Sequence, residues 1–176
     1  VYDGYKLIAE FDVLDADAQP VSYLWQPVGL DVPLMRTTNG VNGYYVADGN
    51  KNIIAVRDSN GTELSNYTYT PFGTVENPED SDDNPFRFSS EYCDDETGLV
   101  YYNYRYYSPE LGRWIKRDPI EEEGGVNLYA MAGNNPANYW DARGLLTEFD
   151  CRCAYWRAVS IFWELISEYP LKRLNQ

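Results

Sequence analysis

The chain has 176 residues with 28 acidic and 14 basic side chains, a formal net charge of −14, and no histidine. The negative charge disfavours nucleic acid as a partner, and the lack of imidazole excludes every mechanism that uses histidine as a base, nucleophile or metal ligand. Tyrosine stands out at 17 residues beside 13 glycines and 10 prolines, a composition typical of short β-strands joined by tight turns.

Residues 1–75 alternate between short apolar runs and turn signals, which predicts a β-sheet segment. Runs rich in apolar, β-branched and aromatic residues indicate strands at 6–11, 21–25, 44–46, 53–56 and 67–70. Turn signals separate them at 15–17, Asn39-Gly40, Asn42-Gly43 and 58–61. Asn-Gly is favoured at the positive φ angles of type I′ hairpins.

One stretch of this segment has the form of a repeat unit. It runs from the strand before Asp48-Gly49-Asn50, through a second turn at Asn60-Gly61, to Tyr69-Thr70-Pro71-Phe72-Gly73. A repeat of about 20–30 residues is the size found in stacked architectures. A lone repeat cannot bury its own face, so the segment needs neighbours from upstream or from the C-terminal half of the chain.

Three further segments follow. Residues 76–85 are polar and acidic, which predicts an exposed loop. Residues 86–145 are rich in aromatic residues and glycine, with the clearest strand signal at 100–107. Residues 146–176 form a tail of different composition, with an amphipathic helix predicted at about 154–169 that ends before Pro170.

The order of residues from Glu91 onward is specific to one family. It reads E-Y-C-D-D-E-T-G-L-V-Y-Y-N-Y-R-Y-Y-S-P and continues E-L-G-R-W-I-K-R-D-P-I. This resembles the Rhs repeat-associated core, whose hallmark is G-L-x-Y-x-x-x-R-Y-Y-x-P-x-x-G-R-(F/W)-x-x-x-D-P. The stretches at 2–4 and 48–73 resemble YD repeats, so the resemblance covers residues 1–145 and leaves out the tail.

The resemblance implies a mainly β fold: a sheet wound as a spiral shell, an aromatic-rich core or plug that closes one end, and a short C-terminal α-helix. In polymorphic toxins of this family the variable region after the core is a toxin held inside the shell. The implied partners are the chain's own upstream YD-repeat shell, its C-terminal tail and an immunity protein. The implied location is secreted or at the cell surface.

The resemblance also implies an aspartic-type protease that acts only on its own chain. The two carboxylates map onto Asp118 and Asp141, and the bond to be cut is Leu145–Leu146. Two carboxylates that share one proton can activate water and protonate the carbonyl. Arg117 matches an arginine before the first aspartate and is predicted to orient a carboxylate or stabilise the oxyanion.

The sequence departs from the family pattern at two places. Glu121 stands where glycine is usual and begins an acidic run that ends at Glu123, and Ala142 replaces a proline. These departures keep open a structural β-scaffold with no cleavage. The tail at 146–176 keeps open a second alternative, a core that carries a short effector or interaction tail. Metal and cofactor sites are not expected, since the Ca²⁺-like stretch at 48–52 and the cysteines Cys93, Cys151 and Cys153 lack a complete ligand pattern. No run of about 18 apolar residues occurs, so a membrane partner is not expected.

Overall fold

The computed structural model describes residues 1–149 except 16, 28–30, 78–83, 142 and 146. The helix predicted at 154–169 lies outside the described residues, as does most of the predicted acidic loop. Among the described residues, no helix has the length and apolar character needed to cross a membrane.

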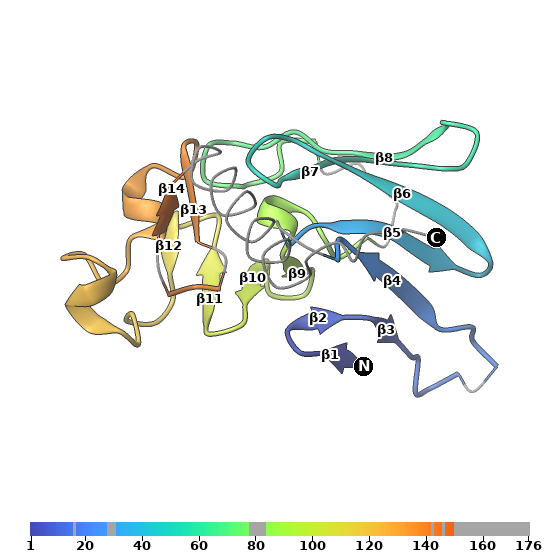
Figure 1. Cartoon of the computed structure of the whole chain (residues 1–176), viewed down its shortest axis with the longest axis horizontal. Coiled ribbons are helices and arrows are strands. Elements are labelled where there is room, and N and C mark those ends of the chain that lie inside the picture. Colours follow the sequence, from blue (N-terminus) through green and yellow to red (C-terminus); the bar gives the residue numbers. More distant parts are fainter. Residues whose placement is uncertain (16, 28–30, 78–83, 142, 146, 150–176) are drawn as a thin grey trace, which may run out of the picture.

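The larger sheet is an antiparallel meander of six strands in the order β3-β4-β5-β6-β7-β8 (Figure 1). A hairpin of two short strands, β1 and β2, precedes it. The bounds of these strands are β1 Tyr2–Asp3, β2 Lys6–Leu7, β3 Ala9–Glu10, β4 Val21–Trp25, β5 Pro33–Thr38, β6 Val41–Ala47, β7 Ile53–Arg57 and β8 Glu63–Asn66.

Two of the predicted turns are confirmed. Asn39 and Gly40 join β5 to β6 and have φ angles of 51° and 76°, the positive values that a type I′ turn needs. Between β7 and β8, a carboxylate oxygen of Asp58 accepts the backbone N–H groups of Asn60 and Thr62, each at 2.8 Å. Short polar side chains of this kind stabilise turns by bonding their own backbone.

Other strand assignments were wrong. The predicted turn at Asn42-Gly43 lies inside β6. Gly43 is needed there for close packing rather than for a turn, because a Cβ at this position would lie 2.9 Å from Cγ1 of Val56. The strand predicted at 67–70 is replaced by β8, four residues earlier, because the chain turns after Thr70, where the Gly73 N–H donates to the Thr70 carbonyl at 2.9 Å. The run at 6–11 is divided between β2 and β3, and β5 was not predicted at all.

The second large sheet contains four antiparallel strands in the order β12-β11-β10-β9. The strand predicted at 100–107 is a hairpin, because Asn103 turns the chain with a φ of 57°. Asparagine tolerates this left-handed conformation better than most residues. The bounds are β9 Tyr92–Asp94, β10 Leu99–Tyr102, β11 Arg105–Ser108 and β12 Arg113–Trp114.

Short elements complete the described chain at its C-terminal side (Figure 1). The last two strands, β13 and β14, form an antiparallel pair in which Asp141 lies opposite Thr147. The chain therefore comes back beside Asp141 after the loop that joins the two strands. The bounds are η1 Phe88–Ser90, η2 Glu121–Gly124, η3 Met131–Asn134, β13 Tyr139–Asp141 and β14 Thr147–Phe149, where η marks a 3₁₀ helix.

Two aromatic-rich clusters form the core, and Tyr69 packs against both. Around Phe86, four rings stand nearly perpendicular to it at centroid distances of 5.0–6.4 Å: Tyr23, Trp25, Tyr45 and Tyr92. Edge-to-face pairs of this kind are favourable beyond the area they bury. The mainly β fold with an aromatic-rich core is confirmed.

The turn after β6 joins the two halves of the chain. Ser90 donates its hydroxyl to the carbonyl of Lys51 at 2.6 Å, and the Ser89 N–H donates to the Asn52 side chain at 2.9 Å. The Ile53 N–H donates to the Arg87 carbonyl at 2.9 Å. The C-terminal half thus supplies the neighbour that the repeat-like segment needs.

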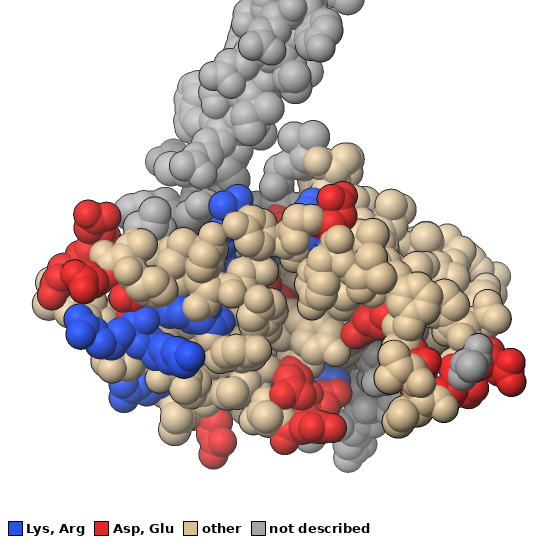
Figure 2. All heavy atoms as spheres, turned by 90° about the horizontal axis from the view of Figure 1, so that it is seen from below, with Lys and Arg blue, Asp and Glu red and all other residues tan. Residues whose placement is uncertain are grey.

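The charge of the chain is unevenly distributed over the face shown in Figure 2. Acidic side chains lie there in separate clusters, and lysine and arginine side chains gather on one side.

The contact between Gly73 and Phe88 predicts a large effect of one added methyl group. Gly73 has a φ of +87°, and a Cβ there would lie 2.4 Å from Cγ of Phe88. Gly73→Ala should lower the free energy of unfolding by about 3 kcal/mol or more, since strain and overpacking add. Gly61→Ala is the matched control, because Gly61 has a similar φ of +82° and a Cβ added there would have no atom within 4 Å. Urea unfolding measures both, and equal losses would contradict the steric argument.

Candidate functional site

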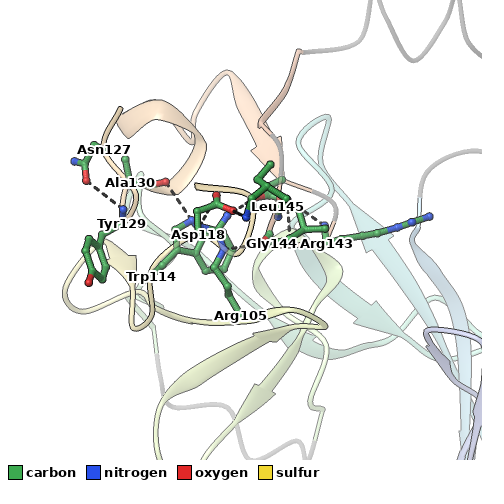
Figure 3. A network of polar contacts seen from close by, with 11 residues as sticks. Arg105, Trp114, Asp118, Asn127, Tyr129, Ala130, Arg143, Gly144 and Leu145 are labelled. Atoms are coloured by element: carbon green, nitrogen blue, oxygen red, sulfur yellow. Dashed lines mark hydrogen bonds and ion pairs between the residues drawn. The ribbon is translucent and has the colours of Figure 1, made fainter. Parts of the chain in front are cut away.

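A buried arginine from β11 joins the segments that carry the predicted site. The guanidinium of Arg105 contacts an oxygen of Asp118 at 2.7 Å and an oxygen of Asp141 at 3.1 Å. Its Nε donates to the carbonyl of Gly144 at 2.5 Å. Figure 3 shows Arg105 pointing toward Asp118 and the loop that ends at Leu145. We call Arg105, Asp118, Asp141 and Gly144 the Arg105 network.

Asp118 reaches this network from the segment after β12. Its N–H donates to the Leu128 carbonyl at 3.0 Å, which joins the segment at Asp118 to the segment at Leu128. One carboxylate oxygen accepts the N–H of Ile120 at 3.1 Å, and the other faces Arg105. The turn chemistry of Asp-Pro therefore aims the carboxylate inward, where only 7% of the residue remains exposed.

Asp141 ends β13 and organises the following loop. One carboxylate oxygen accepts three backbone N–H groups, from Arg143 at 3.1 Å, Gly144 at 2.7 Å and Leu145 at 2.9 Å. The other oxygen faces Arg105. The carboxylate thus fixes the backbone on the N-terminal side of the predicted cleavage point.

Gly124 marks the point where Asp118 and Leu145 approach each other. A Cβ on Gly124 would lie 2.5 Å from Oδ2 of Asp118 and 3.1 Å from the carbonyl oxygen of Leu145. Both oxygens therefore lie beside one small space that any larger residue at position 124 would fill. The Leu145 carbonyl is the one that belongs to the predicted scissile bond.

Trp114 covers one face of the arginine. The guanidinium carbon of Arg105 lies 4.1 Å from the centroid of the Trp114 ring, and the indole N–H donates to the Ala130 carbonyl at 3.1 Å. Trp114 is 1% exposed and Arg105 is 4% exposed, so this side of the network is shielded from water. Shielding strengthens each charge interaction within it.

Burial and ion pairing act against each other in this network. Burial raises the pKa of Asp141, and the N–H groups of Leu145, Arg143 and Gly144 together with Arg105 oppose that rise. Burial lowers the pKa of Arg105, and Asp118 and Asp141 oppose that change. One cation and two carboxylates leave the network with an excess negative charge when all three are ionised.

The predicted residues occupy different positions relative to this network. Asp118 and Asp141 are brought together through Arg105, so an arginine lies between the two carboxylates that were expected to share a proton. Arg117 is exposed, and no ion pair or hydrogen bond joins its side chain to either carboxylate within the described part of the chain. Leu145 is half-buried beside the network, whereas Leu146 lies outside the described residues.

Sequence reasoning missed Arg105. A signal existed, because Arg105 is the only charged residue in the tyrosine-rich run at 100–107 and is the arginine of the R-Y-Y motif. The departures at Glu121, Glu122 and Glu123 fall in η2, where all three side chains are exposed. Solvent therefore screens their charges.

The weaker site candidates have simpler roles where they are described. Asp48 accepts the N–H groups of Asn50 and Asn52, each at 2.8 Å, as a turn residue does. No group of three or more histidine, cysteine, aspartate or glutamate residues is arranged to hold a metal ion in the described part of the chain. Cys93 is a half-buried free thiol, and Cys151 and Cys153 lie outside the described residues.

Comparison with known proteins gives consistent matches. A family model described as teneurin YD-shell matches residues 21–137. The tRNA3(Ser)-specific nuclease WapA of Bacillus spizizenii is 34% identical over 151 residues, which are 81% of this chain and 6% of WapA. Toxin protein Tse5 of Pseudomonas aeruginosa is 48% identical over 62 residues, 35% of this chain and 5% of Tse5. The crystal structure of TcdB2-TccC3-TEV aligns with a TM-score of 0.61 and 28% identity, over 72% of this chain and 7% of that chain. The chain therefore spans a small fraction of the length of these relatives.

The arginine at the centre of the network predicts a pH-dependent loss of stability when it is removed. Arg105→Met leaves Asp118 and Asp141 buried without a cation, so the free energy of unfolding should fall by about 3–5 kcal/mol at pH 7. Burial already raises the pKa of Asp141, and loss of the opposing cation raises that pKa further in the folded state, so the deficit should shrink as the pH falls toward about 4.

Arg57→Met is the matched control. Arg57 forms an exposed pair with Glu63 at 3.5 Å, and its removal should cost less than about 1 kcal/mol at either pH. Urea unfolding of both variants at the two pH values measures the effect. An Arg105→Met deficit that is independent of pH would contradict the electrostatic explanation.

Proposed function

This chain belongs to the teneurin YD-shell family, and from that premise we propose that it closes an Rhs-type toxin shell and cuts its own backbone between Leu145 and Leu146. The shell part of the proposal agrees with relatives named as toxins and with the fold of the TcdB2-TccC3-TEV structure. The cleavage part depends on the chain's own residues.

One observation carries the cleavage proposal. Arg105 holds the Gly144 carbonyl and both carboxylates, and Oδ2 of Asp118 lies beside the Leu145 carbonyl oxygen at the surface of Gly124. A water molecule between Asp118 and the Leu145 carbonyl carbon would complete the set of reacting groups. The loop that Asp141 organises would hold that carbonyl in place.

The proposed reaction is a hydrolysis. The Asp118 carboxylate takes a proton from water, and the water oxygen attacks the carbonyl carbon of Leu145. The guanidinium of Arg105 has five N–H donors and uses three in the contacts above, so a remaining donor can stabilise the oxyanion. The C–N bond to Leu146 then breaks, and its nitrogen receives the proton from Asp118. Because the bond belongs to the same chain, proximity gives a high effective concentration.

A structural role for the same residues is the competing explanation. Asp141 accepts three backbone N–H groups and an arginine contact, which is the full capacity of a buried carboxylate that only stabilises a loop. On this reading the chain is a non-catalytic β-scaffold and stays intact. The Gly124 contact supports cleavage, because a loop-stabilising role of Asp141 does not require Asp118 to face the Leu145 carbonyl.

The proposal extends to partners and location. The upstream YD-repeat shell would enclose the tail at 146–176, and cleavage would separate that tail from the core while the shell retains it. An immunity protein would protect the producing cell. Secretion or display at the cell surface fits a chain whose relatives include a protein named as a toxin.

Removal of the proposed base should stop cleavage. The wild-type chain should give two fragments, 1–145 and 146–176, by intact-mass spectrometry, and Asp118→Asn should slow their appearance by at least about 100-fold. Asp94→Asn is the matched control, because Asp94 only caps an exposed turn, where it accepts the Thr97 hydroxyl at 2.6 Å. If wild type and Asp118→Asn are both intact, the protease proposal is removed and the scaffold remains.

A methyl group at Gly124 should block the reacting geometry. Gly124→Ala places a Cβ against Oδ2 of Asp118 and the Leu145 carbonyl, and a displacement of about 1 Å can cost about 100-fold in rate. Gly49→Ala, with nothing within 4 Å of its Cβ, is the matched control. Cleavage rates of both variants, with urea unfolding to check the fold, make the test. Normal cleavage by Gly124→Ala would place the reaction elsewhere.

A further inference from the structure

The N-terminal hairpin reaches the loop that precedes the proposed cleavage point. The guanidinium carbon of Arg143 lies 5.1 Å from the centroid of the Tyr5 ring. Tyr5 stands in the turn between β1 and β2, and its hydroxyl lies 2.9 Å from the hydroxyl of Tyr104 in the β10–β11 turn. Tyr104 and Arg143 follow Tyr5 in the sequence by 99 and 138 positions, and both contact the Tyr5 side chain.

Arg143 is held by its backbone as well as by its side chain. Its N–H donates to Asp141 at 3.1 Å, and its carbonyl accepts the N–H of Tyr104 at 3.3 Å. Figure 3 shows the Arg143 side chain extending away from Arg105 and Asp118. The Arg143 side chain thus lies outside the Arg105 network and contacts the hairpin instead.

We propose that Tyr5 is a positioning residue for self-cleavage: its ring holds Arg143, so the backbone at 143–145 is better ordered when the N-terminal hairpin has docked. This inference rests on the proposed function. Cation–π attraction at an exposed site is modest, so the ring tunes the loop rather than determining the fold. The consequence is regulatory, because the chain is cut about fivefold faster once its distant β1–β2 turn has folded against the core.

The contact can be tested without any cleavage. In an Asp118→Asn background, hydrogen exchange of the Gly144 and Leu145 amides reports the loop, since both donate to Asp141. Tyr5→Leu should speed this exchange by about fivefold, whereas Tyr5→Phe keeps the ring and should stay near the parent rate. Arg143→Gln should match Tyr5→Leu, and the double variant should add little more. Tyr44→Leu, an exposed tyrosine on β6, is the control and should change nothing.

The same variants in the otherwise wild-type chain test positioning. Tyr5→Leu and Arg143→Gln should slow fragment formation by about fivefold, with Tyr5→Phe near wild type. Unchanged exchange in both variants overturns the contact. Faster exchange with an unchanged cleavage rate overturns the positioning role. An uncut wild type whose exchange still responds to Tyr5→Leu contradicts the proposed function while the Tyr5–Arg143 contact stands. Arg143→Gln changes only an exposed side chain, so it keeps the test valid if Tyr5→Leu fails to fold.

Discussion

The burial of one arginine between two aspartates constrains the whole C-terminal half of this chain. Arg105 is 4% exposed, Asp118 7% and Asp141 3%, so none of the three charges can rely on water. Buried ions are tolerated only when each has close partners of opposite charge and further hydrogen bonds. The segments that carry Asp118, Asp141 and Gly144 must therefore arrive at the same place, and the paths of the loops between them follow from that requirement.

Packing of the aromatic core allows these segments to come together around Arg105. Trp114 covers the guanidinium, and the adjoining aromatic cluster packs β10, β11 and β12 together. Small residues let the loops approach, since a side chain at Gly124 would strike both Asp118 and Leu145. The favourable burial of aromatic surface offsets the conformational entropy lost when distant segments are joined. The polar network is thus a product of the apolar core beside it.

The parts of the fold that were predictable depend on local rules. The Asn39-Gly40 turn follows from backbone preferences of two adjacent residues, and the strand at 21–25 matches β4 residue for residue. Gly43 and Asn103 were misjudged because their roles depend on Val56 across the sheet and on a hairpin within one apolar run. Asp118 and Asp141 could be selected through the family pattern. Arg105 could not be paired with them without knowledge of the fold, whereas Arg117 was selected because it matches the arginine that precedes the first aspartate in the family pattern.

The position of the arginine changes the chemistry that the two carboxylates can perform. Two aspartates in direct contact would share a proton and play interchangeable roles. Here the arginine separates them and gives each a different environment: Asp141 is occupied by three backbone N–H groups, whereas Asp118 accepts one and faces the Leu145 carbonyl. In the proposed cleavage, this asymmetry assigns Asp118 as the base and Asp141 as the anchor of the loop. We therefore propose an arginine-supported single aspartate rather than a symmetrical aspartic dyad.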